Sequence, residues 1–290
     1  MTPGPQQPIA TPTSAPALQG VSHYENFPVA SLLCPPRLRP PIAAIYWFAR
    51  TADDIADEGD APAQTRLDDL AAYRADLMAA AAGLPPSPRW AAVLAQLQPQ
   101  LAQFGLPVNL LADLLSAFVQ DTVKQRYADD AELNDYCRRS ANPVGRLLLH
   151  LYDIHDAASL QMSDDICTAL QLINFWQDLS VDIPRGRIYL PADAWARHGV
   201  DEAQLLALHA NPNTINLIAE CAASARARML KGSQLAKRIP GRGGWELRLV
   251  VQGGLRILDK IEAQGFNTLQ RRPKLGPWDV VVMGWRALFM

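Results

Sequence analysis

The sequence lacks the features by which several classes of protein are recognised. Its 290 residues carry a formal net charge of -2 with Lys and Arg scattered along the chain, so no basic face indicates nucleic-acid binding. The four cysteines lie far apart and include no Cys-x-x-Cys pair. This spacing argues against a zinc site or a disulfide framework and predicts reduced thiols in a cytoplasmic protein. No Gly-x-Gly-x-x-Gly fingerprint of a dinucleotide-binding fold is present.

The two ends of the chain differ in composition. Residues 1–20 are rich in Pro, Thr, Ser, Ala and Gln and lack the basic start and apolar run of a secretory signal, so we expect a disordered tail. No apolar stretch approaches the roughly 20 residues that a membrane-spanning helix needs. Residues 278–290 are apolar and carry two tryptophans. We favour a core helix here, and peripheral contact with the inner face of a membrane stays open.

The remaining sequence has the pattern of helices. Apolar residues recur at helical spacing from about residue 23 to the end, and alternating β-branched strand patterns are nearly absent. Proline and glycine clusters interrupt this pattern at intervals of helix length, with no long linker and no repeat of fixed period. With 49% hydrophobic residues, the chain can bury a large core. The sequence therefore predicts a single all-α domain over residues 21–290.

A polar stripe runs along an otherwise apolar helix predicted at residues 41–58. At about 100° per residue, Tyr46, Arg50, Asp53 and Asp57 fall on one narrow face of this helix. A helix that is apolar nearly all round is usually buried. The stripe is therefore expected to face an interior cleft.

A second polar stripe lies in a helix predicted at residues 163–183, whose first residue is a serine suited to cap it. Gln171, Asn174, Asp178 and Asp182 are spaced by three, four and four residues, so they share one helix face. The other sides of this helix are apolar as well.

Both stripes end in two aspartates at i,i+4 spacing near the end of a helix. Like charges at this spacing are mildly destabilising, and anions at a helix C-terminus oppose the helix dipole. A bound cation would remove both penalties, and Mg²⁺ typically takes one or two carboxylates plus substrate phosphates. Two facing pairs predict a Mg²⁺ cluster that holds a diphosphate, and two solvated acidic faces are the alternative. A di-iron site is excluded because no Glu-x-x-His is present.

These residues resemble the two aspartate-rich motifs of the squalene/phytoene synthase family. The first motif is Tyr46-x-x-x-Arg50-x-x-Asp53-Asp54-x-x-Asp57, and the second is Gln171-x-x-Asn174-x-x-x-Asp178-x-x-x-Asp182, followed by Arg187-Ile-Tyr189. The resemblance covers roughly residues 23 to 275. It implies the isoprenoid synthase fold, a helical bundle around a central apolar cavity.

The resemblance also implies roles for particular residues. It implies that Asp53, Asp57, Asp178 and Asp182 bind Mg²⁺ and diphosphate, and that Asn174 serves the second metal position. Contact with phosphate, or closure of the site, is implied for Arg50, Arg187, Tyr189 and Arg272. Substrate contacts are implied for His23, Asn26 and Phe27 near the N-terminus, for Gln171, and for a mid-chain helix carrying Tyr136, Ala141 and Gly145, where small residues leave room for a prenyl tail. Tyr46 and Asn174, with Gln177, are candidates to position a water molecule.

The chain departs from the phytoene and presqualene synthases at specific positions. Gln177 stands where many relatives have Arg before the aspartate, and Gly254 stands near the position where relatives usually have Tyr. The segments HYENFP and LQLINFWQD are most similar to the hydroxysqualene synthases of bacterial hopanoid biosynthesis. This similarity implies Mg²⁺-dependent conversion of presqualene diphosphate and water to hydroxysqualene, without NADPH, and other enzymes of the same route as partners.

Three alternatives stay open at this point. The same fold could condense two prenyl diphosphates head to head, although Gln177 replaces the arginine that would favour it. It could make squalene with NADPH reduction, since related enzymes bind NADPH without a dinucleotide fingerprint. The chain could also be an inactive helical partner subunit, against which the four intact aspartates argue.

Overall fold

The computed structural model describes residues 34–290, and the predicted tail together with His23, Asn26 and Phe27 lies outside them. The described part is an assembly of helices, with one isolated parallel bridge between Arg126 and Ile188. The all-α prediction is therefore confirmed. The α-helices in chain order are α1 (Arg39–Asp57), α2 (Ala63–Ala81), α3 (Ala91–Phe104), α4 (Val108–Val123), α5 (Asp130–Ser140), α6 (Asn142–Leu151), α7 (Ala157–Gln177), α8 (Leu179–Asp182), α9 (Ala192–Arg197), α10 (Glu202–Leu206), α11 (Pro212–Gly232), α12 (Gly241–Ala263) and α13 (Pro277–Leu288).

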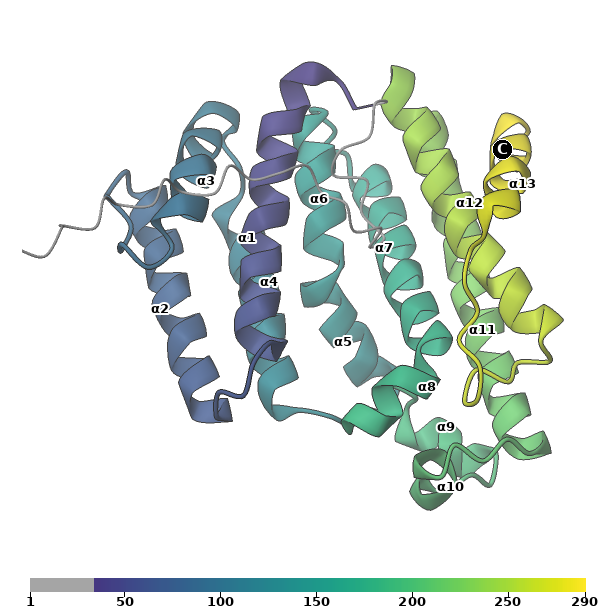
Figure 1. The fold of residues 1–290 in the computed structure, drawn as a ribbon. Helices are drawn as coiled ribbons and strands as arrows, with labels where there is room; N and C mark the ends of the chain where they lie inside the picture. Colours follow the sequence, from purple (N-terminus) through teal and green to yellow (C-terminus); the bar gives the residue numbers. More distant parts are fainter. Residues whose placement is uncertain (1–33) are drawn as a thin grey trace, which may run out of the picture.

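The long helices stand side by side, with α2 and α3 at one edge of the molecule and α12 and α13 at the other (Figure 1). Three short 3-10 segments, η1 (Pro36–Leu38), η2 (Ile183–Arg185) and η3 (Ser233–Lys237), connect or extend them. No helix among residues 34–290 combines the length and the apolar character needed to cross a bilayer.

Helix α1 forms close to the predicted boundaries. Pro40 occupies its first turn, where the missing N–H is not needed. Its apolar side buries Ile45 and Phe48, and the Phe48 ring stacks on Tyr73 of α2 at 5.0 Å between centroids. The helix ends at Asp57, because Glu58 is extended and Gly59 has a φ of 73°. Both aspartates of the first motif therefore lie in the last two turns of one continuous helix.

Helix α7 differs from its predicted form at both ends. It begins at Ala157, where the Asp156 side chain caps it by accepting a hydrogen bond from the Ser159 N–H at 2.9 Å. Ser163 is 3% exposed inside the helix, so its predicted capping role is wrong. At the other end Asp178 has φ -103° and ψ 12°, which stops α7 before the one-turn helix α8 begins. The second stripe is therefore broken at Asp178.

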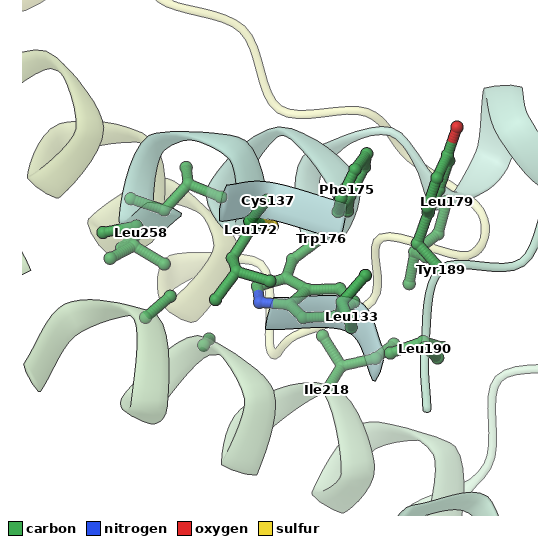
Figure 2. Close-up of a cluster of buried hydrophobic side chains, with 14 of the residues drawn as sticks. Leu133, Cys137, Leu172, Phe175, Trp176, Leu179, Tyr189, Leu190, Ile218 and Leu258 are labelled. Atoms are coloured by element: carbon green, nitrogen blue, oxygen red, sulfur yellow. The ribbon is translucent and has the colours of Figure 1, made fainter. Parts of the chain in front are cut away.

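Two buried clusters of apolar side chains form the core. The first cluster lies among helices α1, α2, α3 and α4, and the second surrounds α7 and α11. Helix α6 contributes Leu147 to the first cluster and Leu149 to the second. Figure 2 shows part of the second cluster, with Leu172 and Trp176 of α7 and Ile218 of α11. Each fully buried side chain of this size contributes about 1.5–3 kcal/mol relative to exposure. The two clusters hold the helices that carry the polar stripes.

Close helix contacts depend on two glycines. A Cβ at Gly232 of α11 would lie 2.6 Å from the Met162 carbonyl oxygen of α7. A Cβ at Gly145 of α6 would lie 2.3 Å from Ser163 Oγ and 2.5 Å from Cys167 Sγ, both on α7. Helices α6 and α11 therefore approach α7 more closely than any side chain would allow.

The C-terminal helix is a surface element, which corrects the prediction of a core helix. Only Asp279, Met283 and Ala287 of α13 are buried. Trp278 is 74% exposed and Trp285 is 64% exposed. The apolar pattern was right about the helix, but most of its apolar side chains face outward.

Candidate functional site

The polar stripe of α1 borders a pocket, as predicted. Tyr46, Arg50 and Asp53 line a cavity of about 190 Å³ between α1, α4 and α6. Apolar side chains complete its wall. These are Ile45 and Ala49 of α1, Phe118 of α4 and Val144 of α6. A charged group and an apolar chain can therefore be held in adjoining parts of one pocket.

Arg50 binds several acidic side chains at the end of α1. Its Nε lies 2.8 Å from Asp54 Oδ1, its Nη1 lies 3.4 Å from Asp53 Oδ2, and its Nη2 donates to Glu58 Oε1 at 2.8 Å. Burial raises the pKa of Asp54, and the positive charge of Arg50 opposes that rise. Asp54 therefore positions the guanidinium beside Asp53.

A short extended segment carries the second motif toward the first. After α4 the chain pairs with the segment that follows η2, where the Ile188 N–H donates to the Gln125 carbonyl at 3.1 Å and the Ala192 N–H donates to the Tyr127 carbonyl at 2.9 Å. Gly186 turns the chain with a φ of 86°, a conformation that favours glycine. This turn directs Arg187 toward α1, where its Nη2 donates to Asp57 Oδ1.

The second motif is held by the segment before α13. Arg272 binds Asp178 through two hydrogen bonds, Nε to Oδ1 at 2.5 Å and Nη2 to Oδ2 at 2.9 Å. Gln177, at the position where the resemblance expects arginine, donates from Nε2 to the Pro273 carbonyl at 2.8 Å. Burial raises the pKa of Asp182 to about 6, the charge of Asp178 adds to the rise, and Arg187 opposes it.

Asp121 of α4 is a further acidic residue of the site, and it lies in the polar segment 120–127, which resembles a cavity-facing polar helix of the family. Its Oδ2 accepts a hydrogen bond from Tyr136 Oη at 2.7 Å. Burial raises its pKa to about 7, the Tyr136 hydrogen bond and Arg187 lower it, and Asp53 and Asp57 add to the rise. Asp121 therefore lies within the electrostatic field of the first motif. Its sequence signal is the polar cluster that ends an apolar helix at residues 120–127.

Aromatic rings form one wall beside these charges. The Tyr189 ring stacks on Phe175 of α7 with centroids 3.7 Å apart, and the two rings lie parallel in Figure 2. Tyr127 stacks on the Tyr189 ring at 5.8 Å, and the Tyr136 ring is tilted against both Tyr127 and Tyr189. Burial raises the pKa of Tyr189 far above its ordinary value, so its hydroxyl stays protonated. The four packed rings therefore form a largely apolar surface that also carries the tyrosine hydroxyl groups.

The remaining predicted site residues lie on α7 and at the start of α6. Gln171 and Asn174 are partly exposed on α7, and the Asn174 carbonyl accepts from the Asp178 N–H at 2.9 Å. Ala141 joins α5 to α6, and Gly145 faces Ser163 and Cys167 of α7, while its neighbour Val144 lines the pocket. The substrate roles of Gln171, Ala141 and Gly145, and the metal role of Asn174, stay predictions.

The donor groups suit a metal ion that is shared with a phosphate ligand. Among residues 34–290, no three Asp, Glu, His or Cys side chains are grouped closely enough to hold a metal by themselves. Mg²⁺ prefers oxygen donors and often completes its shell with water and substrate phosphates. Asp53 and Asp57 on one side, and Asp178 and Asp182 on the other, fit such a shared arrangement.

Known proteins with the same architecture include the squalene synthase HpnC from Alicyclobacillus acidocaldarius. Its crystal structure matches with a TM-score of 0.78 and 36% identity, over 85% of this chain and 91% of that one. The hydroxysqualene synthase from Sinorhizobium fredii is 33% identical over 283 residues, which cover 96% of this chain and 92% of the relative. The presqualene diphosphate synthase from Rhodopseudomonas palustris is 31% identical over 268 residues, 92% of this chain and 94% of the relative.

Fold and site together define this protein as an isoprenoid-synthase-type helical protein. The model of the squalene/phytoene synthase family matches residues 21–279. The chain belongs to the squalene/phytoene synthase family, which acts on isoprenoid diphosphates.

Proposed function

We propose that this protein converts presqualene diphosphate and water to hydroxysqualene and diphosphate in a Mg²⁺-dependent reaction. One observation carries the proposal: Arg187, which follows the second aspartate motif, binds Asp57 of the first motif, and the first motif borders a pocket with an apolar wall. A diphosphate needs cations, and a long isoprenoid chain needs an apolar wall. The relative named hydroxysqualene synthase, matched over nearly its full length, supports this choice within the family.

The chain's own charged residues would bind the diphosphate. Arg187 and Arg272 bind carboxylates in this structure, and both guanidinium groups are suited to pair with phosphate oxygens instead. Asp53 and Asp57, with Asp178 and Asp182 opposite, would hold Mg²⁺. When bound, Mg²⁺ supplies Lewis-acid stabilisation of the charge that develops on the leaving diphosphate. Positioned cations act most strongly where water is excluded.

The reaction balances with water as the only co-reactant. The carbon–oxygen bond to diphosphate breaks, the diphosphate keeps the electron pair, and a cyclopropylcarbinyl cation remains. After rearrangement, a water oxygen bonds to the cation and loses a proton to solvent. The stacked rings of Phe175 and Tyr189 would help to exclude bulk water, which would otherwise quench the cation too early. Tyr46 and Asn174, with Gln177, are the candidates to position the attacking water.

The test is product analysis by mass spectrometry without NADPH. Purified protein is incubated with presqualene diphosphate or with farnesyl diphosphate. Each substrate is tested in one sample with Mg²⁺ and in a parallel sample with excess EDTA. Hydroxysqualene from presqualene diphosphate alone, and only with Mg²⁺, is the expected result. Presqualene diphosphate or a phytoene-type product from a simple prenyl diphosphate would instead support head-to-head condensation, the activity that the name of the Rhodopseudomonas palustris relative gives. Absence of any diphosphate release would support a non-catalytic partner subunit.

A further inference from the structure

The outward side of α13 is apolar along its whole length. At 100° per residue, Trp278, Val281, Trp285, Leu288 and Phe289 fall within one stripe, which we call the outer face of α13. Their exposed fractions run from 55% for Leu288 to 74% for Trp278 and Phe289. The Trp285 and Phe289 rings touch edge to face, with centroids 5.0 Å apart. Large exposed apolar patches mark interaction surfaces rather than ordinary protein surface.

This exposure does not come from a loosely attached helix. The opposite side of α13 buries Asp279, whose carboxylate binds Arg256 Nε at 2.6 Å and Lys260 Nζ at 2.8 Å. The Gly276 N–H donates to the same carboxylate at 2.7 Å. Near the other end, Arg248 Nη1 donates to the Ala287 carbonyl at 3.2 Å. Helix α13 is thus fixed to α12 at both ends, and it presents its outer face outward at the edge of the molecule (Figure 1).

The charge beside the outer face is positive. Asp279 is the only acidic residue among residues 271–290, and it is buried and ion-paired. Arg286 flanks the stripe, and its side chain is 43% exposed. Its ion-pair partner Asp259 also binds Arg226 at 2.9 Å, so one carboxylate is shared by two guanidinium groups.

A second cavity lies where Arg248 meets the end of α13. Its volume is about 320 Å³, and Lys237, Trp245 and Arg248 are among its lining residues. Trp245 is 42% exposed, and the Arg248 guanidinium lies 4.8 Å from the centre of its ring. Arg248 therefore connects the C-terminal end of α13 to a basic, tryptophan-bearing hollow.

We propose that the outer face of α13 docks on an anionic phospholipid surface. Helices that lie in a membrane interface carry aromatic and aliphatic residues on one side and basic residues beside them, and tryptophan favours the headgroup level. The 12-residue helix is too short to span a bilayer, but its exposed stripe suits shallow insertion. The basic groups at Arg286, Lys237 and Arg248 would then face lipid phosphates.

A second copy of the chain fits this face less well. A two-fold dimer would set the same patch against itself, and residues 271–290 of the second copy offer Arg286 no acidic side chain besides the buried Asp279. A bilayer of anionic lipid offers the opposite charge instead. The outer face is therefore complementary to lipid in both polarity and charge.

The test is flotation of the full-length protein with vesicles in the absence of substrate. Vesicles of phosphatidylcholine alone are compared with vesicles of phosphatidylcholine and phosphatidylglycerol. The double variant Trp285→Ser/Phe289→Ser is compared with Leu206→Ser/Leu230→Ser, which removes two apolar side chains of 52% exposure on other helices. Circular dichroism and thermal melting confirm that each variant is folded.

We expect the wild-type protein and the Leu206/Leu230 variant to float with the anionic vesicles, and flotation to weaken at high salt. The Trp285/Phe289 variant should bind at least about tenfold more weakly, because two interfacial aromatics are lost. Equal flotation of the two variants would overturn the proposal, as would failure of the wild-type protein to float. A wild-type dimer in light scattering that becomes monomeric only in the Trp285/Phe289 variant, without flotation, would overturn it too and assign the face to self-association.

Discussion

Arg187 and Asp57 lie 130 residues apart in the sequence and form an ion pair across the candidate site. The arginine comes from the turn after the second aspartate motif, and the aspartate ends the helix of the first. The pair connects the two halves of the site. The planar guanidinium group matches the geometry of both a carboxylate and a phosphate. Arg187 is therefore suited to exchange Asp57 for a diphosphate oxygen.

Replacement of Arg187 should therefore impair diphosphate handling more than folding. We expect Arg187→Gln to lower kcat by about 100-fold and to weaken product inhibition by inorganic diphosphate, since a positioned cation is lost. Arg187→Lys should recover part of the affinity, because it keeps the charge but not the planar fork. Steady-state kinetics of diphosphate release measure both effects. Arg138→Gln removes an exposed arginine paired to Asp135 and should leave both values unchanged; equal losses in the two Gln variants would contradict the role of Arg187.

Neutral replacement of the motif aspartates should abolish turnover. Asp53→Asn and Asp178→Asn are each expected to reduce diphosphate release by at least about 100-fold, because Mg²⁺ loses a carboxylate donor. Asp68→Asn removes an exposed carboxylate from α2 and should have no effect. Activity is measured over a Mg²⁺ titration, with thermal melting as the folding control. Wild-type activity in a folded Asp53→Asn or Asp178→Asn protein would contradict the metal-site assignment.

The pKa of Asp121 predicts a pH-dependent stability. The carboxyl is buried and its folded-state pKa is raised to about 7, above that of an unfolded aspartate. The folded state therefore retains a proton that the unfolded state releases, and stability falls as pH rises from about 4 toward 7. Tyr136 and Arg187 oppose this shift, whereas Asp53 and Asp57 add to it.

Asp121→Asn should remove this contribution, so its free energy of unfolding should vary less than that of the wild type between pH 5 and about 7. Urea unfolding without Mg²⁺ or substrate, at a series of pH values, makes the comparison. Parallel pH profiles for the two proteins would show that Asp121 titrates as an ordinary surface aspartate.

Two glycine-to-alanine changes should shift stability in opposite directions. In Gly232→Ala the new Cβ would meet backbone atoms of α7, the Met162 oxygen at 2.6 Å and the Ile166 nitrogen at 3.0 Å. Overpacking of this kind costs about 1–3 kcal/mol. In Gly284→Ala the new Cβ has no neighbour within 4 Å in α13, so helix propensity should stabilise the protein by up to about 1 kcal/mol. Thermal unfolding of both variants checks the sign, and destabilisation of equal size in both would contradict the packing argument.

The sequence could predict the first half of the site well because one signal dominated there. The apolar surface of α1, its proline start and its glycine after the end all agree, so the places of Asp53 and Asp57 followed from helical spacing. The second half carried competing signals. Ser163 with two following aspartates has the form of a helix start, yet Asp156 caps the helix seven residues earlier. No proline or glycine marks the break at Asp178.

Features decided by distant contacts could not be predicted from local pattern. Helix α13 has apolar residues on two sides, and the buried side is selected by the binding of Asp279 to Arg256 and Lys260 of α12. Asp121 lies in the polar segment that ends α4, and its position near Arg187 depends on the pairing of residues 125–128 with residues 188–193. The identity of the substrate is a further step, because relatives of nearly equal similarity are named for different reactions.

The break at Asp178 means that the two aspartate pairs are held in place in different ways. The first pair of aspartates belongs to an unbroken helix clamped into the core, so Asp53 and Asp57 keep a fixed separation. The second pair straddles a joint: Asp178 closes α7 while Asp182 ends the separate turn of α8. Leu179 and Ile183 beside this break are buried, and the Ser180 N–H donates to the Thr268 carbonyl at 3.2 Å, so the position of Asp182 depends on contacts outside α7. The separation of Asp53 and Asp57 is therefore set within one helix, whereas the separation of Asp178 and Asp182 is set by how α7 and α8 pack against the rest of the core.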